Sequence, residues 1–186
     1  MKRITFDHIQ KRKKELEVLK RTLDGYAHEA LRASKRAIFA FQRGDGKEAG
    51  ELLGVARDNV RLGTKIVFKQ PLLTGDGQWR AALEEYTEAT LFGTYLDGEM
   101  RAPDECAEYP DVLLGGLSDT AGELARYAVL RATERDKKAV ESAYKTALHI
   151  VELFAALDLT GSLRAKFDQS KSHLRKIEDI RYDLSK

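Results

Sequence analysis

The chain has 186 residues, a length that suits one domain with a substantial buried core. Lys and Arg total 32 against 30 Asp and Glu, so the net charge of +2 by itself indicates no particular partner. The single cysteine, Cys106, excludes an intrachain disulfide, and no stretch approaches the ~20 apolar residues that span a bilayer. We expect one cytoplasmic domain over residues 1–186 with no membrane partner.

The composition predicts helix throughout, because long stretches rich in Ala, Leu, Glu, Lys and Arg contain only three prolines. Turns are predicted at Gly44–Gly46 and Gly75–Gly77, a helix end before Pro71, and a helix start at Pro110. The apolar spacing then predicts helices over residues 5–43, 47–69, 78–96, 110–132, 136–157 and 162–184. The expected fold class is all-α, an antiparallel bundle of six to seven helices.

Four acids lie on two of these helices at positions that otherwise look buried. Glu85 and Glu88 fall on one face of the third helix, which is apolar nearly all round. Asp119 and Glu123 lie one turn apart on the fourth helix, on a face that also carries glycines. Those glycines favour close approach of another backbone, or leave room for a ligand. Carboxylates in an apolar interior require a positive partner.

Two kinds of partner fit these acids. For any one of them an ion pair with Lys or Arg is the common arrangement, and Arg126 is placed to pair with Glu123. Four acids meeting across two helices favour a divalent ion instead, and all-oxygen ligands favour Mg²⁺ or Mn²⁺. Two such ions activate water and stabilise the leaving oxygen of a phosphodiester. Iron is disfavoured, because no histidine completes a Glu-x-x-His pair.

Basic residues indicate a surface for a polyanion. A stripe with a spacing of four runs along the second helix, and a smaller cluster ends the first helix; with Arg126 they form the candidate RNA-binding set of Lys35, Arg36, Arg43, Arg57, Arg61, Lys65 and Lys69. The alternative for the stripe is a solvated helix face. Asp58 is the only acid within three or four residues of a member of the stripe, so local neutralisation is incomplete.

Four segments in the same order resemble the translin family, and within it the X-type members. They are Ser34–Phe39, Glu85–Ala89, Asp119–Leu124 and the closing stretch 163–185. The resemblance implies an all-α fold that assembles into a hollow octameric shell with RNA on its inner wall. It also implies Mg²⁺-dependent endoribonuclease activity, with Glu85, Glu88, Asp119 and Glu123 as metal-binding catalytic acids. We expect a homo-oligomer that acts on single-stranded RNA, with single-stranded DNA as a further ligand.

Two other functions are open from the sequence. The motif Glu84-Glu85-x-x-Glu88 is similar to half of the metal site of all-α nucleoside-triphosphate pyrophosphatases. Its only candidate second half, Glu108-x-x-Asp111, contains Pro110, which disfavours a helical pair. The other alternative is a non-catalytic RNA-binding or DNA-binding scaffold whose acids pair with basic side chains.

Overall fold

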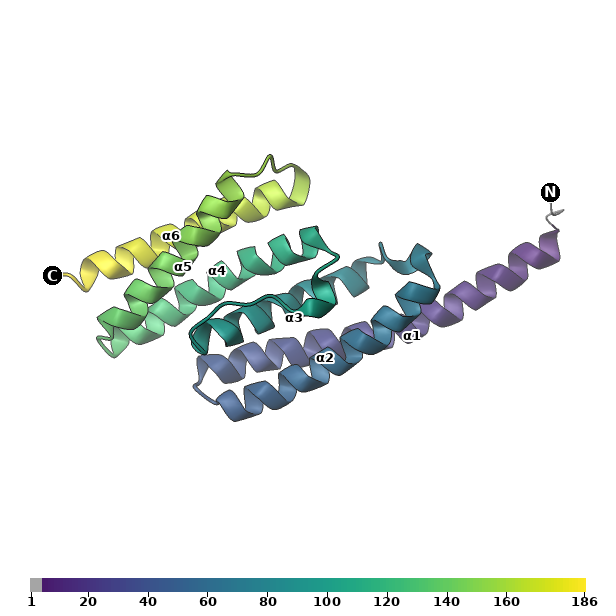
Figure 1. Cartoon of the computed structure of the whole chain (residues 1–186), viewed down its shortest axis with the longest axis horizontal. Helices are drawn as coiled ribbons and strands as arrows, with labels where there is room; N and C mark the ends of the chain where they lie inside the picture. Colours follow the sequence, from purple (N-terminus) through teal and green to yellow (C-terminus); the bar gives the residue numbers. More distant parts are fainter. Residues whose placement is uncertain (1–4) are drawn as a thin grey trace.

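In the computed structural model, which describes residues 5–186, the chain folds into six α-helices (Figure 1). They are α1 (Phe6–Gln42), α2 (Gly46–Lys69), α3 (Gly77–Leu96), α4 (Pro110–Thr133), α5 (Lys137–Ala155) and α6 (Gly161–Asp183). Short 3-10 turns, η1 (Pro71–Leu73) and η2 (Asp104–Cys106), lie in two of the connections. The all-α prediction is confirmed, and the two 3-10 turns are features that it does not include.

Two of the helices begin at aspartate caps that lie within the predicted turns. Asp45 and Asp76 each accept hydrogen bonds from backbone N–H groups in the first turn of the helix that follows. Pro110 is the first residue of α4, where a missing N–H costs nothing. Within residues 5–186, no helix has the length and apolar character needed to cross a membrane.

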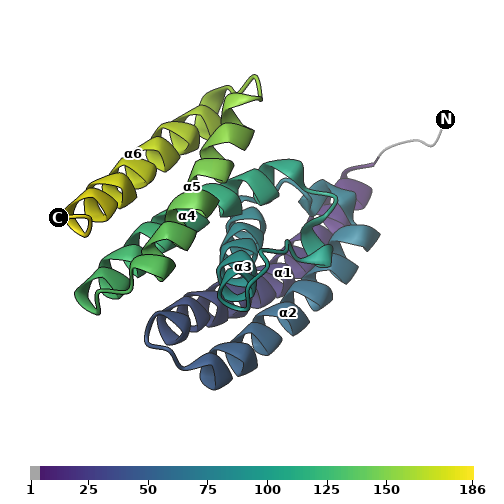
Figure 2. The same cartoon turned by 60° about the vertical axis from the view of Figure 1, so that its left-hand side comes forward.

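The helices form two groups joined through α3 and α4. In the first group α1 packs along α2 and α3, and in the second α4, α5 and α6 pack against one another. Figure 2 shows α3 between α1 and α4. Because α3 packs against α1 on one side and α4 on the other, it is largely buried, as its nearly continuous apolar surface predicts.

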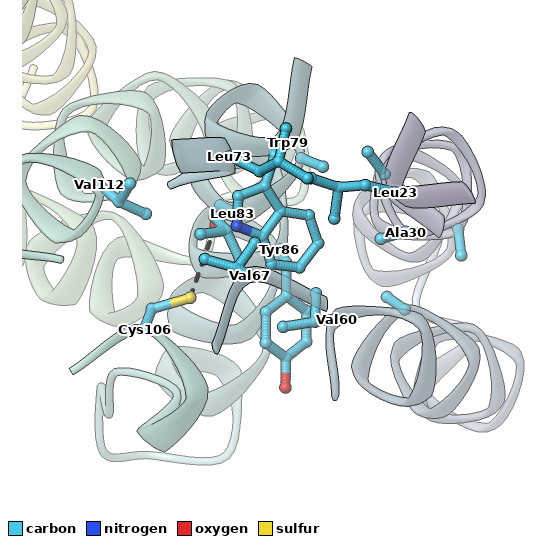
Figure 3. Packing of buried hydrophobic residues seen from close by; sticks show 14 residues of the cluster. Leu23, Ala30, Val60, Val67, Leu73, Trp79, Leu83, Tyr86, Cys106 and Val112 are labelled. Carbon is cyan, nitrogen blue, oxygen red and sulfur yellow. Dashed lines mark hydrogen bonds between the residues drawn. The ribbon is translucent and has the colours of Figure 1, made fainter. Parts of the chain in front are cut away.

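The first group packs around Trp79, which is fully buried (Figure 3). Leu23 of α1 and Val60 of α2 belong to the same cluster. A Cβ atom on Gly63 would lie 2.3 Å from the Trp79 ring, so any larger residue at this position of α2 would overlap the indole. Cys106 is buried nearby and its thiol donates to the Leu83 carbonyl at 3.9 Å.

The second group, made of α4, α5 and α6, has a core of its own. Fully buried Leu124, Ile150, Phe154 and Ile177 form its centre. The rings of Phe154 and Phe167 stack with centroids 6.0 Å apart. The first core includes buried residues of α3, and the second includes buried residues of α4. The contact between α3 and α4 therefore joins the two cores.

Candidate acidic site between α3 and α4

Two glycines on α4 let this helix approach α3 closely. A Cβ atom on Gly116 would lie 2.5 Å from the Thr87 side chain and 3.1 Å from the backbone nitrogen of Glu88. On Gly115 it would lie 2.7 Å from the Glu84 carboxylate. Of the two roles that the sequence leaves open, Gly116 therefore serves the close approach of a neighbouring backbone. This approach brings the acids of the two helices to one interface.

Glu88 is the most deeply buried of the four acids, with 8% of its surface exposed. Burial, followed by the charges of Glu85, Asp119 and Glu123, raises the pKa of its carboxyl to about 9. The charges of these three acids act on Glu88, so the four predicted acids influence one another across the α3–α4 interface. Among residues 5–186, Glu88 forms no ion pair with a Lys or Arg side chain.

The other three acids each have a protein partner. Lys35 of α1 lies 3.7 Å from Glu85, whose pKa is raised mainly by burial while Lys35 opposes the rise. The Lys166 ammonium donates to Asp119 at 2.7 Å and lies 3.1 Å from Glu84. These contacts make up the ion-pair arrangement that the sequence offers as an alternative, but they leave Glu88 without a cation of its own.

Glu123 is held by an amide and by no cation within residues 5–186. The side-chain nitrogen of Gln42 donates to the Glu123 carboxylate at 2.7 Å and to its backbone carbonyl at 3.2 Å. The expected ion pair between Arg126 and Glu123 is wrong. The Arg126 guanidinium instead lies over the Phe39 ring, 5.2 Å from its centroid, because Arg126 points to the exposed side of α4.

Three further residues at this site escape prediction from the sequence. Lys166 and His173 come from α6, and Gln42 comes from the end of α1. His173 lies against Gly122, and burial lowers its pKa while Asp119 and Glu123 act in the opposite direction. No local motif indicates these residues, since they reach the acids through the packing of distant helices.

The four acids supply carboxylate oxygens, the ligands that hard divalent ions such as Mg²⁺ prefer. Within the described part of the chain, however, no three acidic, His or Cys side chains converge closely enough to form a ready-made metal site. Lys35 and Lys166 hold Glu85 and Asp119 instead. Binding of an ion by all four acids therefore requires both ammonium groups to move aside.

The predicted basic residues are exposed, with differing partners. Arg36 and Arg43 both lie near Glu48, at 3.7 and 2.8 Å. Arg61 donates to Glu105 at 2.8 Å, a neutralising acid that lies far along the chain. No salt bridge within residues 5–186 involves the other members of the stripe on α2, which are Arg57, Lys65 and Lys69.

The second half of the pyrophosphatase-like motif does not form a helical pair. Glu108 precedes the first residue of α4, and Asp111 is exposed and lies 3.5 Å from Arg80. As the proline predicts, these two acids do not present a joint ligand face. They also contribute nothing to the cluster around Glu88.

The fold and the buried acids together define an all-α protein with an acidic site between two central helices. The Translin family model matches residues 27–185, so the chain belongs to the translin family. A comparison with curated proteins gives no significant match.

Solved structures show the same fold. The crystal structure of apo-NeC3PO is 19% identical over 99% of both chains, with a TM-score of 0.87. The structure of an AfC3PO–duplex RNA complex and the crystal structure of AfC3PO are each 24% identical, with TM-scores of 0.88 over 98% of this chain and 97% of theirs. At these identities the likeness concerns the fold.

Proposed function

We propose that this protein is a divalent-metal-dependent endoribonuclease whose catalytic acids are Glu85, Glu88, Asp119 and Glu123. The observation that carries the proposal is the buried Glu88 carboxyl, whose ionised form is disfavoured by the charges of three other carboxylates and which, within residues 5–186, has no ion-pairing Lys or Arg of its own. A stable fold tolerates such a group when it is protonated or when a cation binds beside it. Mg²⁺, or Mn²⁺ in its place, would supply the positive charge that balances the four carboxylates.

The reaction would be hydrolysis of a phosphodiester. The oxygen of water forms a bond to phosphorus, the bond from phosphorus to the leaving ribose oxygen breaks, and that oxygen takes up a proton. A bound divalent ion supplies an activated water and stabilises the charge on the phosphate. The carboxylates of the chain would hold such an ion, while Gln42 orients Glu123 through its amide.

Binding of RNA is part of the same proposal. The solved AfC3PO–duplex RNA complex is a protein of this fold with RNA bound, and the exposed Arg57, Lys65 and Lys69 offer charge for phosphates. The sequence favours single strands as the substrate, whereas that structure contains a duplex, so both forms belong in every assay.

The direct test replaces ligand oxygens without changing shape. We expect Glu85→Gln and Asp119→Asn to keep RNA affinity but to lower Mg²⁺-dependent cleavage at least about 100-fold, because removing outer-sphere partners alone costs about 10–100-fold. Cleavage of labelled single-stranded and duplex RNA across a Mg²⁺ series measures this, with EDTA as the blank.

The matched control is Glu29→Gln, since Glu29 is exposed on α1 and pairs with Arg32. Either site variant cutting at the wild-type rate would remove these acids from catalysis. Binding without cleavage by the wild type would indicate a scaffold. Release of pyrophosphate from free nucleotides without RNA cleavage would indicate the pyrophosphatase-like activity.

Assembly of several copies, up to the octamer that the family resemblance implies, is a further part of the proposal. Large apolar side chains are exposed at Phe6 (86%), Phe68 (87%) and Leu72 (74%), which burial between copies would cover. We expect light scattering to give a mass several times that of one chain, and Phe68→Glu to lower it. A wild-type protein that stays a monomer at all concentrations would contradict the expectation.

A further inference from the structure

A cavity borders Gln42, the residue that holds Glu123. Its volume is about 270 Å³, and its lining residues come from the turn from α1 to α2 and from the ends of α3 and α4. Its walls include Phe41, Gln42, Leu96, Asp97, Tyr127 and Arg131. Gln42 is thus shared, because its side-chain nitrogen holds Glu123 while the residue also borders this cavity.

Two buried polar atoms of the lining residues lack hydrogen-bond partners. Among residues 5–186 only four buried side-chain nitrogen or oxygen atoms are unpartnered, and two of them, Gln42 Oε1 and Arg131 Nε, belong to residues that line the cavity, where neighbouring protein atoms cover them. Gln42 is 7% exposed, and its amide orientation is set by the bond to Glu123, which leaves the oxygen as the free acceptor. Buried polar groups normally have partners.

The walls provide flat apolar surface beside these atoms. Phe41 lies directly over Gly93, where a Cβ atom would come within 2.5 Å of its ring. Tyr127 packs edge-on against Phe92, with ring centroids 6.2 Å apart. Both residues line the cavity, and both rings contact residues of α3. Aromatic side chains of this kind are the surfaces on which nucleobases stack.

The charges in the cavity do not favour a phosphate. The Arg131 guanidinium lies 2.8 Å from Glu134 and over the Tyr127 ring, so its charge already has partners. Asp97 adds a negative charge to the lining. The groups still without hydrogen-bond partners are one acceptor, Gln42 Oε1, and one donor, Arg131 Nε. Nucleobases carry both donors and acceptors on their hydrogen-bonding edges.

We propose that this cavity is a nucleobase-binding subsite, which takes one base of the RNA strand whose phosphodiester lies at the acids. The base stacks on Phe41 or Tyr127, donates to Gln42 Oε1 and accepts from Arg131 Nε once the two side chains rotate to expose these covered atoms. The inference rests on the proposed function, because the base belongs to the strand that the catalytic acids would cut. Through Gln42, an occupied subsite would also hold Glu123 in place.

Photocrosslinking tests the contact directly. The full-length Glu85→Gln protein is irradiated with short single-stranded RNAs that carry 4-thiouridine at successive positions, and the crosslinked peptides are identified by mass spectrometry. We expect crosslinks at Phe41 or Tyr127 from one position of the strand. The same nucleobase chemistry in a free mononucleotide is tested with 4-thiouridine monophosphate alone, and labelling by the mononucleotide but not by RNA would overturn the RNA assignment.

Affinity measurements give an independent readout. We expect Tyr127→Leu and Arg131→Lys to weaken binding of single-stranded RNA about fivefold or more, in line with the cost of removing a base stack. The salt dependence of binding should keep its slope, because the variants leave every phosphate contact in place. Arg32→Lys, on the exposed side of α1, is the matched control. Arg131→Lys keeps the charge and removes the Nε donor, so its result stands even where Tyr127→Leu fails to fold.

The outcomes separate this proposal from the proposed function. RNA that is bound and cut by the wild type, with no crosslink at the cavity and wild-type affinity in both variants, would leave a water-filled cavity and overturn the subsite alone. Absence of any RNA binding would overturn both proposals. Crosslinks at the cavity with an unchanged salt slope would support the subsite, whether or not cleavage is seen.

Discussion

Glu88 is in an environment that favours its neutral form. Burial acts first, and the neighbouring carboxylates add to it, while the more distant charge of Lys166 opposes them. Glu85 and Asp119 have lysines within 4 Å and Glu123 has an amide, so the cost of the cluster falls mainly on Glu88. A divalent ion at this site would remove that cost, so metal binding and the charge of Glu88 should be linked.

The pKa of Glu88 predicts how stability depends on pH. Its folded pKa of about 9 lies above the ordinary value of 4.5, so between these values the unfolded chain releases a proton that the folded protein keeps. The contribution of Glu88 is fully present below about pH 4.5 and is lost as pH rises toward 9. We expect Glu88→Gln, which is neutral at every pH, to flatten this fall by more than the ~1.4 kcal/mol that one pKa unit represents.

Urea unfolding in EDTA across pH 5 to 9 measures the effect. Glu29→Gln serves as the control and should retain the wild-type fall in stability. Identical pH profiles for wild type and Glu88→Gln would show that Glu88 does not stay protonated in the folded protein.

At the scale of elements, glycines set how closely the central helices pack. Gly116 lets α4 lie against α3 at Thr87, and Gly63 lets α2 lie against the Trp79 ring. Both contacts form where a side chain on the glycine would overlap a buried neighbour. They fix the positions of the helices that carry the acids.

A pair of glycine substitutions on α2 tests this packing. We expect Gly63→Ala to lower the free energy of unfolding by about 1–3 kcal/mol, because the added methyl group overlaps the buried indole. Gly54→Ala on the same helix should raise it by about 0.5–1 kcal/mol, because alanine is the better helix former and nothing lies within 4 Å of its Cβ. Thermal and urea unfolding of both variants gives the two signs, and a neutral Gly63→Ala would show that the Trp79 contact adjusts freely.

At the scale of the whole molecule, exposed charge is spread unevenly over α2. Glu105 of η2 neutralises Arg61, whereas Arg57 and Lys65 belong to the part of the stripe that forms no salt bridge within residues 5–186. The first turns of α1 project beyond the other helices, with Phe6 exposed (Figure 1). Polar and apolar surface thus remain available for RNA and for further copies of the chain.

The stripe predicts the salt dependence of RNA binding. We expect Arg57→Ala combined with Lys65→Ala to weaken binding and to reduce the slope of log affinity against log salt by about 0.7 to 0.9 for each phosphate that the variant no longer neutralises. Anisotropy titrations over a range of salt concentrations measure the slope. Lys137→Ala combined with Lys138→Ala, on α5, is the control; equal slopes for the two double variants would exclude the stripe from the binding surface.

The local features of this protein follow from its sequence. Helix bounds are predictable to within a few residues because glycine, proline and aspartate act on their own neighbours, as Asp45 and Asp76 show by capping. Helical periodicity places the two acids of each helix on one face. Glu85 and Glu88, for example, share a face of α3 whatever packs against it. The resemblance to the translin family is also a sequence feature, because it rests on four segments in the same order.

Only the tertiary structure decided what each acid meets. Lys166 lies 47 residues beyond Asp119, and Gln42 lies 81 residues before Glu123. Arg126, close to Glu123 in sequence, lies against Phe39 instead. The partners of a buried charge depend on which distant helices pack beside it, and spacing along one helix carries no information about that packing.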